Sequence, residues 1–367
     1  MSYKKLMFIF GTRPEAIKMA PIILKAKEDP FFDVKICLTA QHREMLDDVM
    51  DKFGLKADYD LNIMKQRQTV QGITSDIITA LPSVFEKENP DLVLVHGDTT
   101  TAFAAALAAF YSKTPVAHVE AGLRSGNDYS PFPEEMNRKL VSNIARLHFA
   151  PTSSNAANLN KEGITENIYV VGNSVIDALK YTVRESHRFS CDVINSVDFS
   201  KRVILMTAHR RENLGRPLLN ILTAVKRIAT EYPDVYFVYP VHPNPAVKDT
   251  AEKLLSGVKN VILTSPVDVF DMHNLMEKCF FVLTDSGGLQ EEAPALSKPV
   301  LVTRTETERP EAVDAGTVKI IGVDEETVYS EIKRLLTDES AYAQMEHAAN
   351  PYGCGDTSEK IVEILKA

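Results

Sequence analysis

Two apolar runs in the first half of the chain lead directly into carboxylates. Asp98 follows the run 91–96 and is succeeded by three threonines, and Glu120 closes the run 115–120. Carboxylates gathered at one place can exchange protons with a ligand or stabilise a developing positive charge. Helix capping is the alternative role for Asp98, because Asp is a favoured N-cap residue.

A third carboxylate and a cation open a later helical pattern. Glu134 and Arg138 are four residues apart, so they share a helix face. Glu134 adds a third carboxylate to Asp98 and Glu120. The alternative is a surface ion pair of little energetic weight.

Histidines follow two apolar runs of the second half. His209 comes after 202–207, and His242 comes after 235–240. A single histidine is more often structural than functional. Two at equivalent positions shift the balance toward a catalytic role.

The segment Ser286-Gly287-Gly288 connects an apolar run to a helical pattern. Unpaired amides at such a helix start suit a diphosphate. Glu292, expected about two turns into that helix, has the chemistry to bind both hydroxyls of a ribose. Arg309 adds a cation. We interpret this set as a nucleoside-diphosphate site.

A similar arrangement begins the chain. Gly11, Thr12 and Arg13 follow the first apolar run, and Lys18 lies about one helical turn later. This pattern predicts a phosphate-facing helix start, with a plain strand-to-helix turn as the alternative. The glycine spacing of a dinucleotide fingerprint is absent, so no nicotinamide cofactor is expected.

Short apolar runs alternate with helical patterns along the whole chain, which predicts strands joined by helical crossovers. Continuously apolar strands indicate burial on both faces, as in parallel sheets. The expected strands are 5–10, 34–39, 91–96, 115–120, 147–150 and 168–172 in the first half, then 202–207, 235–240, 260–264, 279–284, 299–303 and 318–322 in the second.

We therefore predict an α/β fold of two Rossmann-like, doubly wound domains facing across a cleft. The first covers 1–171 and the second 172–355, with a C-terminal helix at 356–367 packed back on the first. Ligands of such sheets bind beyond the carboxyl ends of the strands.

Composition excludes several classes of protein. The net charge of −9 opposes nucleic-acid binding. No run approaches the roughly 20 apolar residues of a membrane span, so no membrane partner is expected. The four scattered cysteines fit neither a disulfide framework nor a zinc site, and a reducing cytoplasmic location is expected.

Two short motifs are interpreted as chance matches. Asp58-Tyr59-Asp60 matches the Asp-x-Asp of metal-dependent glycosyltransferases but is expected in a polar turn away from any strand end. Tyr329 and Lys333 match a pair found in nicotinamide-dependent sugar enzymes, without the dinucleotide fingerprint. No metal is predicted.

The strings GTRPEAIKMAP, HGDTTT, HVEAGLRS, PFPEEMNR, TAHRREN, VHPNP, TDSGGLQEEAP and TERPEA, in this order, resemble the non-hydrolysing UDP-N-acetylglucosamine 2-epimerases over nearly the whole chain. The resemblance implies a fold of the glycosyltransferase B type, a homodimer, and interconversion of UDP-GlcNAc and UDP-ManNAc for cell-wall polysaccharide synthesis.

The implied chemistry is an elimination. Carbon 2 of the sugar has no adjoining carbonyl, and oxidation would need the absent nicotinamide site. Loss of UDP and of the carbon-2 proton would give a glycal, and re-addition would invert the centre.

The resemblance carries roles onto individual residues. The catalytic set is Asp98, Glu120, Glu134, Arg138 and His209, with Asp98 or Glu134 as base, Glu120 as cation stabiliser and Arg138 supporting Glu134. The UDP-sugar contacts are Arg13, Lys18, His242, Ser286, Gly287, Gly288, Glu292 and Arg309. Met272 stands where many members carry a phenylalanine near the uracil.

Bacterial members also bind UDP-GlcNAc as an allosteric activator, at positions matching Gln41, His42 and Arg67. The alternative is a polar helix start at Gln41 and a solvated Arg67. Three rival functions remain open: a hydrolysing epimerase that releases ManNAc and UDP, a glycosyltransferase, and a non-catalytic nucleotide-sugar sensor.

Overall fold

Apolar runs form the strands of two parallel sheets. The computed structural model describes residues 4–41, 43–65, 68–307 and 309–367. The chain divides into two units, of which the first comprises Met1–Tyr181 with Tyr352–Ala367 and the second comprises Thr182–Pro351.

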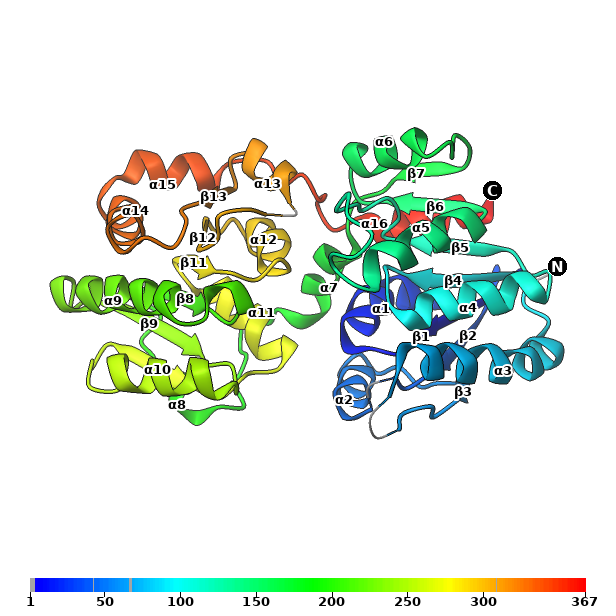
Figure 1. Ribbon diagram of the computed structural model, residues 1–367, viewed down its shortest axis with the longest axis horizontal. Coiled ribbons are helices and arrows are strands. Elements are labelled where there is room, and N and C mark those ends of the chain that lie inside the picture. Colours follow the sequence, from blue (N-terminus) through cyan, green and yellow to red (C-terminus); the bar gives the residue numbers. More distant parts are fainter. Residues whose placement is uncertain (1–3, 42, 66–67, 308) are drawn as a thin grey trace. The chain divides into compact units, whose positions relative to one another are not determined.

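The sheet of the first unit has seven strands within the described ranges, in the order β3-β2-β1-β4-β5-β6-β7, all parallel. They are β1 (Lys4–Phe10), β2 (Phe32–Leu38), β3 (Tyr59–Asp60), β4 (Leu92–His96), β5 (Val116–Val119), β6 (Leu147–Ala150) and β7 (Ile168–Val170). Its helices are α1 (Arg13–Lys27), α2 (Glu44–Lys52), α3 (Val70–Glu88), α4 (Thr100–Tyr111), α5 (Glu134–Ile144), α6 (Ser153–Lys161), α7 (Ser174–Thr182, whose last residue begins the second unit) and α16 (Thr357–Lys366) (Figure 1).

Helices pack on both faces of this sheet. Met7 and Ile9 of β1 belong to one apolar cluster with α3 and α4. Successive side chains of a strand point to opposite faces, so the equally buried Phe8 and Phe10 face the other side. Both faces are therefore covered, which explains why the strands lack polar alternation.

The sheet of the second unit has six described strands, in the order β10-β9-β8-β11-β12-β13, again all parallel. They are β8 (Arg202–Thr207), β9 (Val235–Pro240), β10 (Val261–Thr264), β11 (Phe281–Thr284), β12 (Val300–Val302) and β13 (Val318–Ile320). The helices are α8 (Asp192–Asn195), α9 (Arg216–Glu231), α10 (Pro245–Leu255), α11 (Val269–Lys278), α12 (Leu289–Glu292), α13 (Pro310–Asp314), α14 (Glu325–Thr337) and α15 (Glu339–Glu346), with the 3₁₀ turns η1 (Arg211–Asn213) and η2 (Ala293–Leu296).

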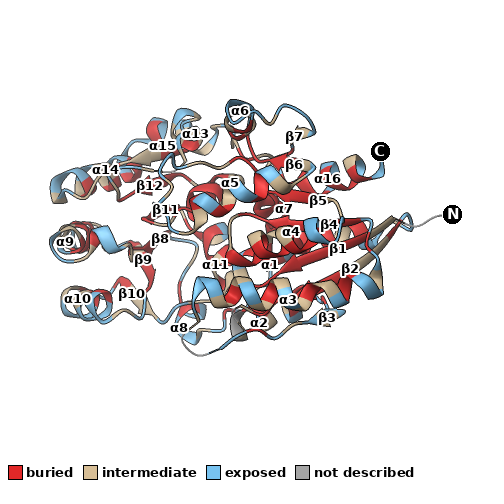
Figure 2. Cartoon of the chain, turned by 45° about the vertical axis from the view of Figure 1, so that its right-hand side comes forward, coloured by how far each residue is buried: buried red, intermediate tan, exposed pale blue. Residues whose placement is uncertain are grey.

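The predicted fold class is confirmed: each unit is a doubly wound α/β structure. Figure 2 shows the central strands, such as β4, β5 and β11, as buried, whereas many helices are buried on one side and exposed on the other. Such amphipathic helices bury one face on the sheet. None of the helices in the described part of the chain is long and apolar enough to cross a membrane.

One strand was not expected from the sequence. Tyr59 and Asp60 form β3 at the edge of the first sheet, where they pair with Cys37 and Leu38 of β2. Placing Asp58-Tyr59-Asp60 away from any strand was wrong, because a two-residue edge strand has no apolar run to reveal it. Asp58 accepts a hydrogen bond from the Ile36 amide at 2.8 Å.

The C-terminal helix α16 belongs to the first unit. The Lys4 ammonium donates to the Leu365 carbonyl at 2.7 Å, and Lys366 pairs with Asp29 at 2.5 Å. The buried carboxylate of Asp177, on α7, accepts hydrogen bonds from the amides of Thr357 and Ser358 at the start of α16. These bonds fix the helix against β1, α1 and α7.

Candidate functional site

Side chains from four neighbouring strands gather at the carboxyl edge of the first sheet. In sheet order, Gln41 follows β2, Arg13 follows β1, Asp98 follows β4 and Glu120 follows β5. A parallel sheet brings these ends to one edge, where ligands of such sheets bind. The structure therefore brings together residues that are up to 107 positions apart, from Arg13 to Glu120.

Glu120 occupies a constrained position in this set. Its φ of 63° lies in the left-handed region, which costs a non-glycine residue on the order of 1–3 kcal/mol. Its carboxylate pairs with the Lys18 ammonium and accepts a hydrogen bond from the Asn173 amide group at 3.1 Å. The side chain is only 12% exposed. Such strain persists where the surroundings determine the conformation, and it is typical of functional sites.

The turn before Asp98 fits closely against Glu120. Gly97 has a φ of 63°, and a Cβ added to it would lie 3.2 Å from a carboxylate oxygen of Glu120. The ring of His118 lies beneath this turn, and its Nε2 donates to the Gly97 carbonyl at 2.7 Å. Burial lowers the pKa of His118 to about 3, so the ring is neutral and can keep this bond.

A second histidine lies beside the Glu120 carboxylate. His96 Nε2 is 3.7 Å from Glu120 Oε2. Burial lowers the pKa of His96 to about 4 and outweighs the attraction of Glu120. The positive partner of Glu120 at neutral pH is thus Lys18, and His96 is a neutral neighbour.

Asp98 is held by α5. Arg138 lies 2.5 Å from the Asp98 carboxylate, and the Asn137 amide group donates to the Asp98 carbonyl at 2.9 Å. The alternative that Asp98 caps the next helix is wrong. Thr99 is the N-cap of α4, and its hydroxyl accepts from the Ala102 amide at 2.9 Å. The Asp98 carboxylate is therefore available for other chemistry.

Arg138 pairs with Asp98 and Glu135, whereas the family resemblance assigns it to the support of Glu134. Its second partner is Glu135, at 2.9 Å, and the structure forms no ion pair between Arg138 and Glu134. The four-residue spacing predicted that pair, but α5 turns Arg138 inward to Asp98. Glu134, the first residue of α5, is half-buried.

Glu135 is a site residue that sequence reasoning missed. It is fully buried and accepts hydrogen bonds from the amides of Ser125 and Gly126 at 2.9 and 3.1 Å. Burial alone would raise the pKa of Glu135, but these bonds and Arg138 lower it below its usual range. An ionised Glu135 therefore fixes both Arg138 and the segment after β5.

The backbone amides just before α1 donate hydrogen bonds to a carboxylate of the same helix, that of Glu15. Glu15 accepts hydrogen bonds from the amides of Gly11 and Thr12, at 3.1 and 2.9 Å, and from the Thr99 hydroxyl, at 2.7 Å. Burial raises the pKa of Glu15 to about 7 despite these bonds. Glu15 thus links the turn that carries Arg13 to the turn that carries Asp98.

Gln41 is connected to the same network. Its side-chain oxygen accepts from the Thr101 hydroxyl at 3.0 Å, and Thr101 lies 2.9 Å from the Thr39 hydroxyl. Its predicted companions, His42 and Arg67, lie outside the described residues.

The second unit repeats the arrangement with different chemistry. His242 follows β9, His209 follows β8 and Asp285 follows β11, on three adjacent strands. The rings of His209 and His242 stack at 5.5 Å with planes 8° apart. His209 Nδ1 lies 3.2 Å from the fully buried Asp285 carboxylate. Sequence reasoning missed Asp285, although it is the residue directly after β11.

The Ser-Gly-Gly turn of this unit packs tightly on Arg309. A Cβ added to Gly287 would lie 2.7 Å from the Arg309 guanidinium, so a larger residue there would require the guanidinium to move. Arg309 is oriented by Glu291, at 2.7 Å. The amide of Ser286 donates to the Thr284 hydroxyl at 2.9 Å, so it is already used within the chain.

Glu292 lies about one helical turn after the Ser-Gly-Gly turn, not two as expected, because α12 begins at Leu289 and Glu292 is its fourth residue. The helix ends there, since Pro294 lacks an amide hydrogen and the chain tightens into η2. Its carboxylate lies 3.3 Å from Nε2 of the buried His273, and Nδ1 of that ring contacts the Thr182 hydroxyl at 2.7 Å. Met272, the neighbour of His273 on α11, is half-buried.

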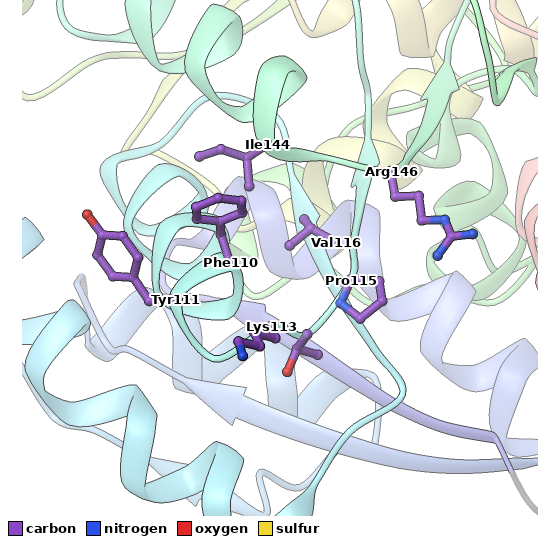
Figure 3. Close-up of a pocket in the computed structure, with 8 residues that line it drawn as sticks. Phe110, Tyr111, Lys113, Pro115, Val116, Ile144 and Arg146 are labelled. Atoms are coloured by element: carbon purple, nitrogen blue, oxygen red, sulfur yellow. The ribbon is translucent and has the colours of Figure 1, made fainter.

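An apolar pocket of about 530 Å³ lies elsewhere in the first unit. Figure 3 shows Phe110, at the end of α4, near Val116 at the start of β5, with Tyr111 pointing away from them. Asp98 and Glu120 follow the opposite, carboxyl ends of β4 and β5. The pocket is therefore separate from the gathered carboxylates.

The described side chains include no group of three or more His, Cys, Asp and Glu residues that could hold a metal ion. Asp60 of the Asp-x-Asp string pairs with Arg43 at 2.5 Å. Tyr329 and Lys333 both contact Glu231 on the surface of the second unit, away from its strand ends.

Comparisons with known proteins identify the family. Residues 24–366 match the family of UDP-N-acetylglucosamine 2-epimerases. The UDP-N-acetylglucosamine 2-epimerase of Bacillus subtilis (strain 168) is 54% identical over 366 residues, covering 100% of this chain and 96% of the relative. The crystal structure of UDP-GlcNAc 2-epimerase from Neisseria meningitidis bound to UDP-GlcNAc is 49% identical, with a TM-score of 0.88 and 99% of both chains covered.

A more distant similarity concerns the fold alone. The glycosyltransferase of kitacinnamycin is 11% identical, with a TM-score of 0.69 over 100% of this chain and 99% of that one. It agrees with the predicted fold of the glycosyltransferase B type. The extent and identity of the closer matches show that this chain is an enzyme that belongs to the UDP-N-acetylglucosamine 2-epimerase family.

Proposed function

We propose that this enzyme interconverts UDP-GlcNAc and UDP-ManNAc without releasing free sugar. The observation that carries the proposal is the pair of carboxylates Asp98 and Glu120, at the ends of adjacent strands in a chain of this family. The relative from Neisseria meningitidis was solved bound to UDP-GlcNAc, which supports the choice of substrate.

The proposed reaction is an elimination followed by re-addition. The bond from the anomeric carbon to the UDP oxygen breaks, the carbon-2 proton goes to an enzyme base, and 2-acetamidoglucal and UDP result. Re-formation of that bond, with a proton delivered to the other face of carbon 2, gives the epimer. The bond breaking places positive charge on the anomeric carbon, which carboxylates stabilise.

The contacts of the carboxylates support separate roles for them. Asp98, held at 2.5 Å by Arg138, and Glu134 are the two choices for the base. Glu120, fixed between Lys18 and Asn173, stabilises the positive charge. His209 acts on the diphosphate or in proton transfer.

The nucleotide is assigned mainly to the second unit. Ser286, Gly287, Gly288 and Arg309 hold the diphosphate, and Glu292 binds the ribose. His242 and Met272 complete this set, and Arg13 and Lys18 of the first unit supply further cations. Each unit thus contributes a different part of the chemistry.

Proton NMR in heavy water tests the proposal. Incubation with UDP-GlcNAc should give UDP-ManNAc deuterated at carbon 2, and Asp98→Asn should lower this exchange at least 100-fold. Free ManNAc and UDP would instead identify a hydrolysing enzyme. Absence of any exchange, with UDP-GlcNAc still bound, would identify a sensor. Sugar transfer to an acceptor, without exchange, would identify a glycosyltransferase.

We also propose that UDP-GlcNAc activates the enzyme through Gln41, together with His42 and Arg67. The hydrogen bond from Thr101 to Gln41 supports a connection to the start of α4, three residues from Asp98. UDP-ManNAc alone should turn over with a lag that a trace of UDP-GlcNAc removes. Ordinary saturation kinetics without a lag would contradict activation.

We further propose that the enzyme is a cytoplasmic homodimer. The four cysteines are free thiols, as expected in a reducing compartment. Phe110 and Tyr111 are 60% and 65% exposed on the first unit, which fits a contact with a second copy. Light scattering on the eluting protein tests the dimer, and cell fractionation tests the location.

A further inference from the structure

Asp285 has an uneven distribution of hydrogen bonds over its two carboxylate oxygens. The side chain is 0% exposed and directly follows β11. Oδ2 accepts from the amides of His209 and Arg210, at 2.7 and 2.8 Å, and from the Asn213 amide group, at 3.1 Å. Oδ1 forms no hydrogen bond in the structure, and its ion-pair contact is with the His209 ring, whose Nδ1 lies 3.2 Å away. One oxygen thus fixes the loop after β8, and the other faces a single imidazole nitrogen.

The strand ends beneath this pair are fixed by further hydrogen bonds. The hydroxyls of Thr207 and Thr284, the last residues of β8 and β11, lie 2.6 Å apart. The Tyr239 hydroxyl donates to the Ala208 carbonyl at 2.8 Å. The backbone on both sides of His209 is therefore held, and its ring has one well-defined neighbour for Nδ1.

Chemistry then determines which nitrogen carries the proton. A carboxylate oxygen accepts hydrogen bonds, so the hydrogen of a neutral His209 belongs on Nδ1. The lone pair is left on Nε2, the nitrogen of this 35% exposed side chain that is not set against Asp285. The opposite tautomer would set two lone pairs against each other at 3.2 Å.

The neighbouring histidine has the complementary tautomer. The Asn244 amide donates to His242 Nδ1 at 3.1 Å, which requires a lone pair on that nitrogen. A neutral His242 thus stacks on His209 and adds no second positive charge. Arg210 and Glu212, of the loop that carries His209, also act electrostatically on the ring.

We propose that Asp285 is a positioning residue, which holds His209 with its hydrogen on Nδ1 so that Nε2 is the nitrogen presented to the ligand. This inference rests on the proposed function of His209. In this state Nε2 can accept a proton, and the resulting cation remains paired with Asp285. The same logic applies to any histidine whose orientation is set by a buried carboxylate.

The wild-type enzyme tests the assignment without turnover. Nitrogen-15 NMR of the unliganded protein, with the signal assigned through a His209→Asn sample, should show the hydrogen on Nδ1. A hydrogen on Nε2 would overturn the inference. This measurement is independent of the substrate, so it stands even if the exchange experiment rejects the proposed function.

The variant Asp285→Asn tests the consequence. Its carboxamide oxygen can keep the amides of His209 and Arg210, while its NH₂ group faces Nδ1 and forces the hydrogen onto Nε2. We expect kcat to fall on the order of 10²–10⁴-fold, with KM for UDP-GlcNAc changed less than about threefold and the low-pH limb of the kcat profile lost. An unchanged kcat, or a change in KM alone, would overturn the proposal.

A matched variant separates positioning from loss of stability. Asn260 is buried in the same unit, and its amide group donates to the carbonyls of Ala229 and Val235 at 2.9 and 2.7 Å. Asn260→Ala should lower Tm as much as Asp285→Asn or more, yet retain kcat within about threefold. Equal losses of kcat in both variants would show that Asp285 acts only through stability.

Discussion

The guanidinium of Arg138 lies 2.5 Å from the carboxylate of Asp98, which connects α5 to the end of β4. Arg138 also contacts the buried Glu135, so one cation joins two carboxylates from different parts of the chain. This contact replaces the helical pair with Glu134 that spacing alone predicts. It makes the position of Asp98 dependent on α5.

Replacing Arg138 by lysine should therefore impair catalysis more than folding. A lysine keeps the charge but cannot bind two carboxylates at once with fixed geometry. We expect kcat for carbon-2 exchange to fall about 10- to 100-fold, with a smaller change in KM. Lys139→Ala is the control, because Lys139 lies on the same helix and forms only a half-exposed ion pair with Asp128. Its kcat should stay within about twofold of the wild-type value. Equal effects of the two variants would contradict the prediction.

Glu15 should make the enzyme less stable as pH rises. Its pKa is raised from 4.5 to about 7 by burial, so the folded state binds a proton that the unfolded state has already lost between these values. The free energy of unfolding should fall across this window, by on the order of 2–3 kcal/mol from this group. Denaturant unfolding at pH 5 and pH 8 measures the change. Glu15→Gln should flatten the dependence, and parallel curves for both proteins would contradict this role.

Gly287→Ala should weaken nucleotide binding. The added Cβ would lie 2.7 Å from the Arg309 guanidinium, and would displace it from Glu291. Titration calorimetry with UDP should show about a tenfold loss of affinity, equivalent to about 1.4 kcal/mol. Gly257→Ala is the matched control, since nothing lies within 4 Å of its added Cβ. If UDP binds both variants equally, Arg309 does not contribute to the site.

His273→Ala should raise KM with little change in kcat. The ring orients Glu292 at 3.3 Å and is itself held by Thr182 at 2.7 Å, so its removal leaves the carboxylate that we propose binds the nucleotide without this support. Steady-state kinetics should show KM for UDP-GlcNAc raised about 5- to 20-fold. His347→Ala, at a side chain 77% exposed in the same unit, should change nothing. A fall in kcat at constant KM would contradict the assignment of Glu292 to binding.

The sequence by itself determined the two doubly wound sheets and the turns that carry the site. Strands buried on both faces need continuous apolar runs, which remain visible without any structure. Each strand end then identifies the residues that follow it, such as Asp98, Glu120 and His209. The order of these motifs carried the family resemblance, and the resemblance implied the roles of the individual residues.

Tertiary structure alone decided the partners of those residues. Hydrogen bonding, helix rotation and backbone conformation depend on neighbours remote in the chain, so spacing could not predict that Arg138 turns to Asp98, or that Asp285 faces His209. Nor could it predict that Glu120 adopts a left-handed conformation while its carboxylate bonds to Asn173. The short strand β3 was missed for the same reason, because pairing with β2 defines it and its own two residues do not.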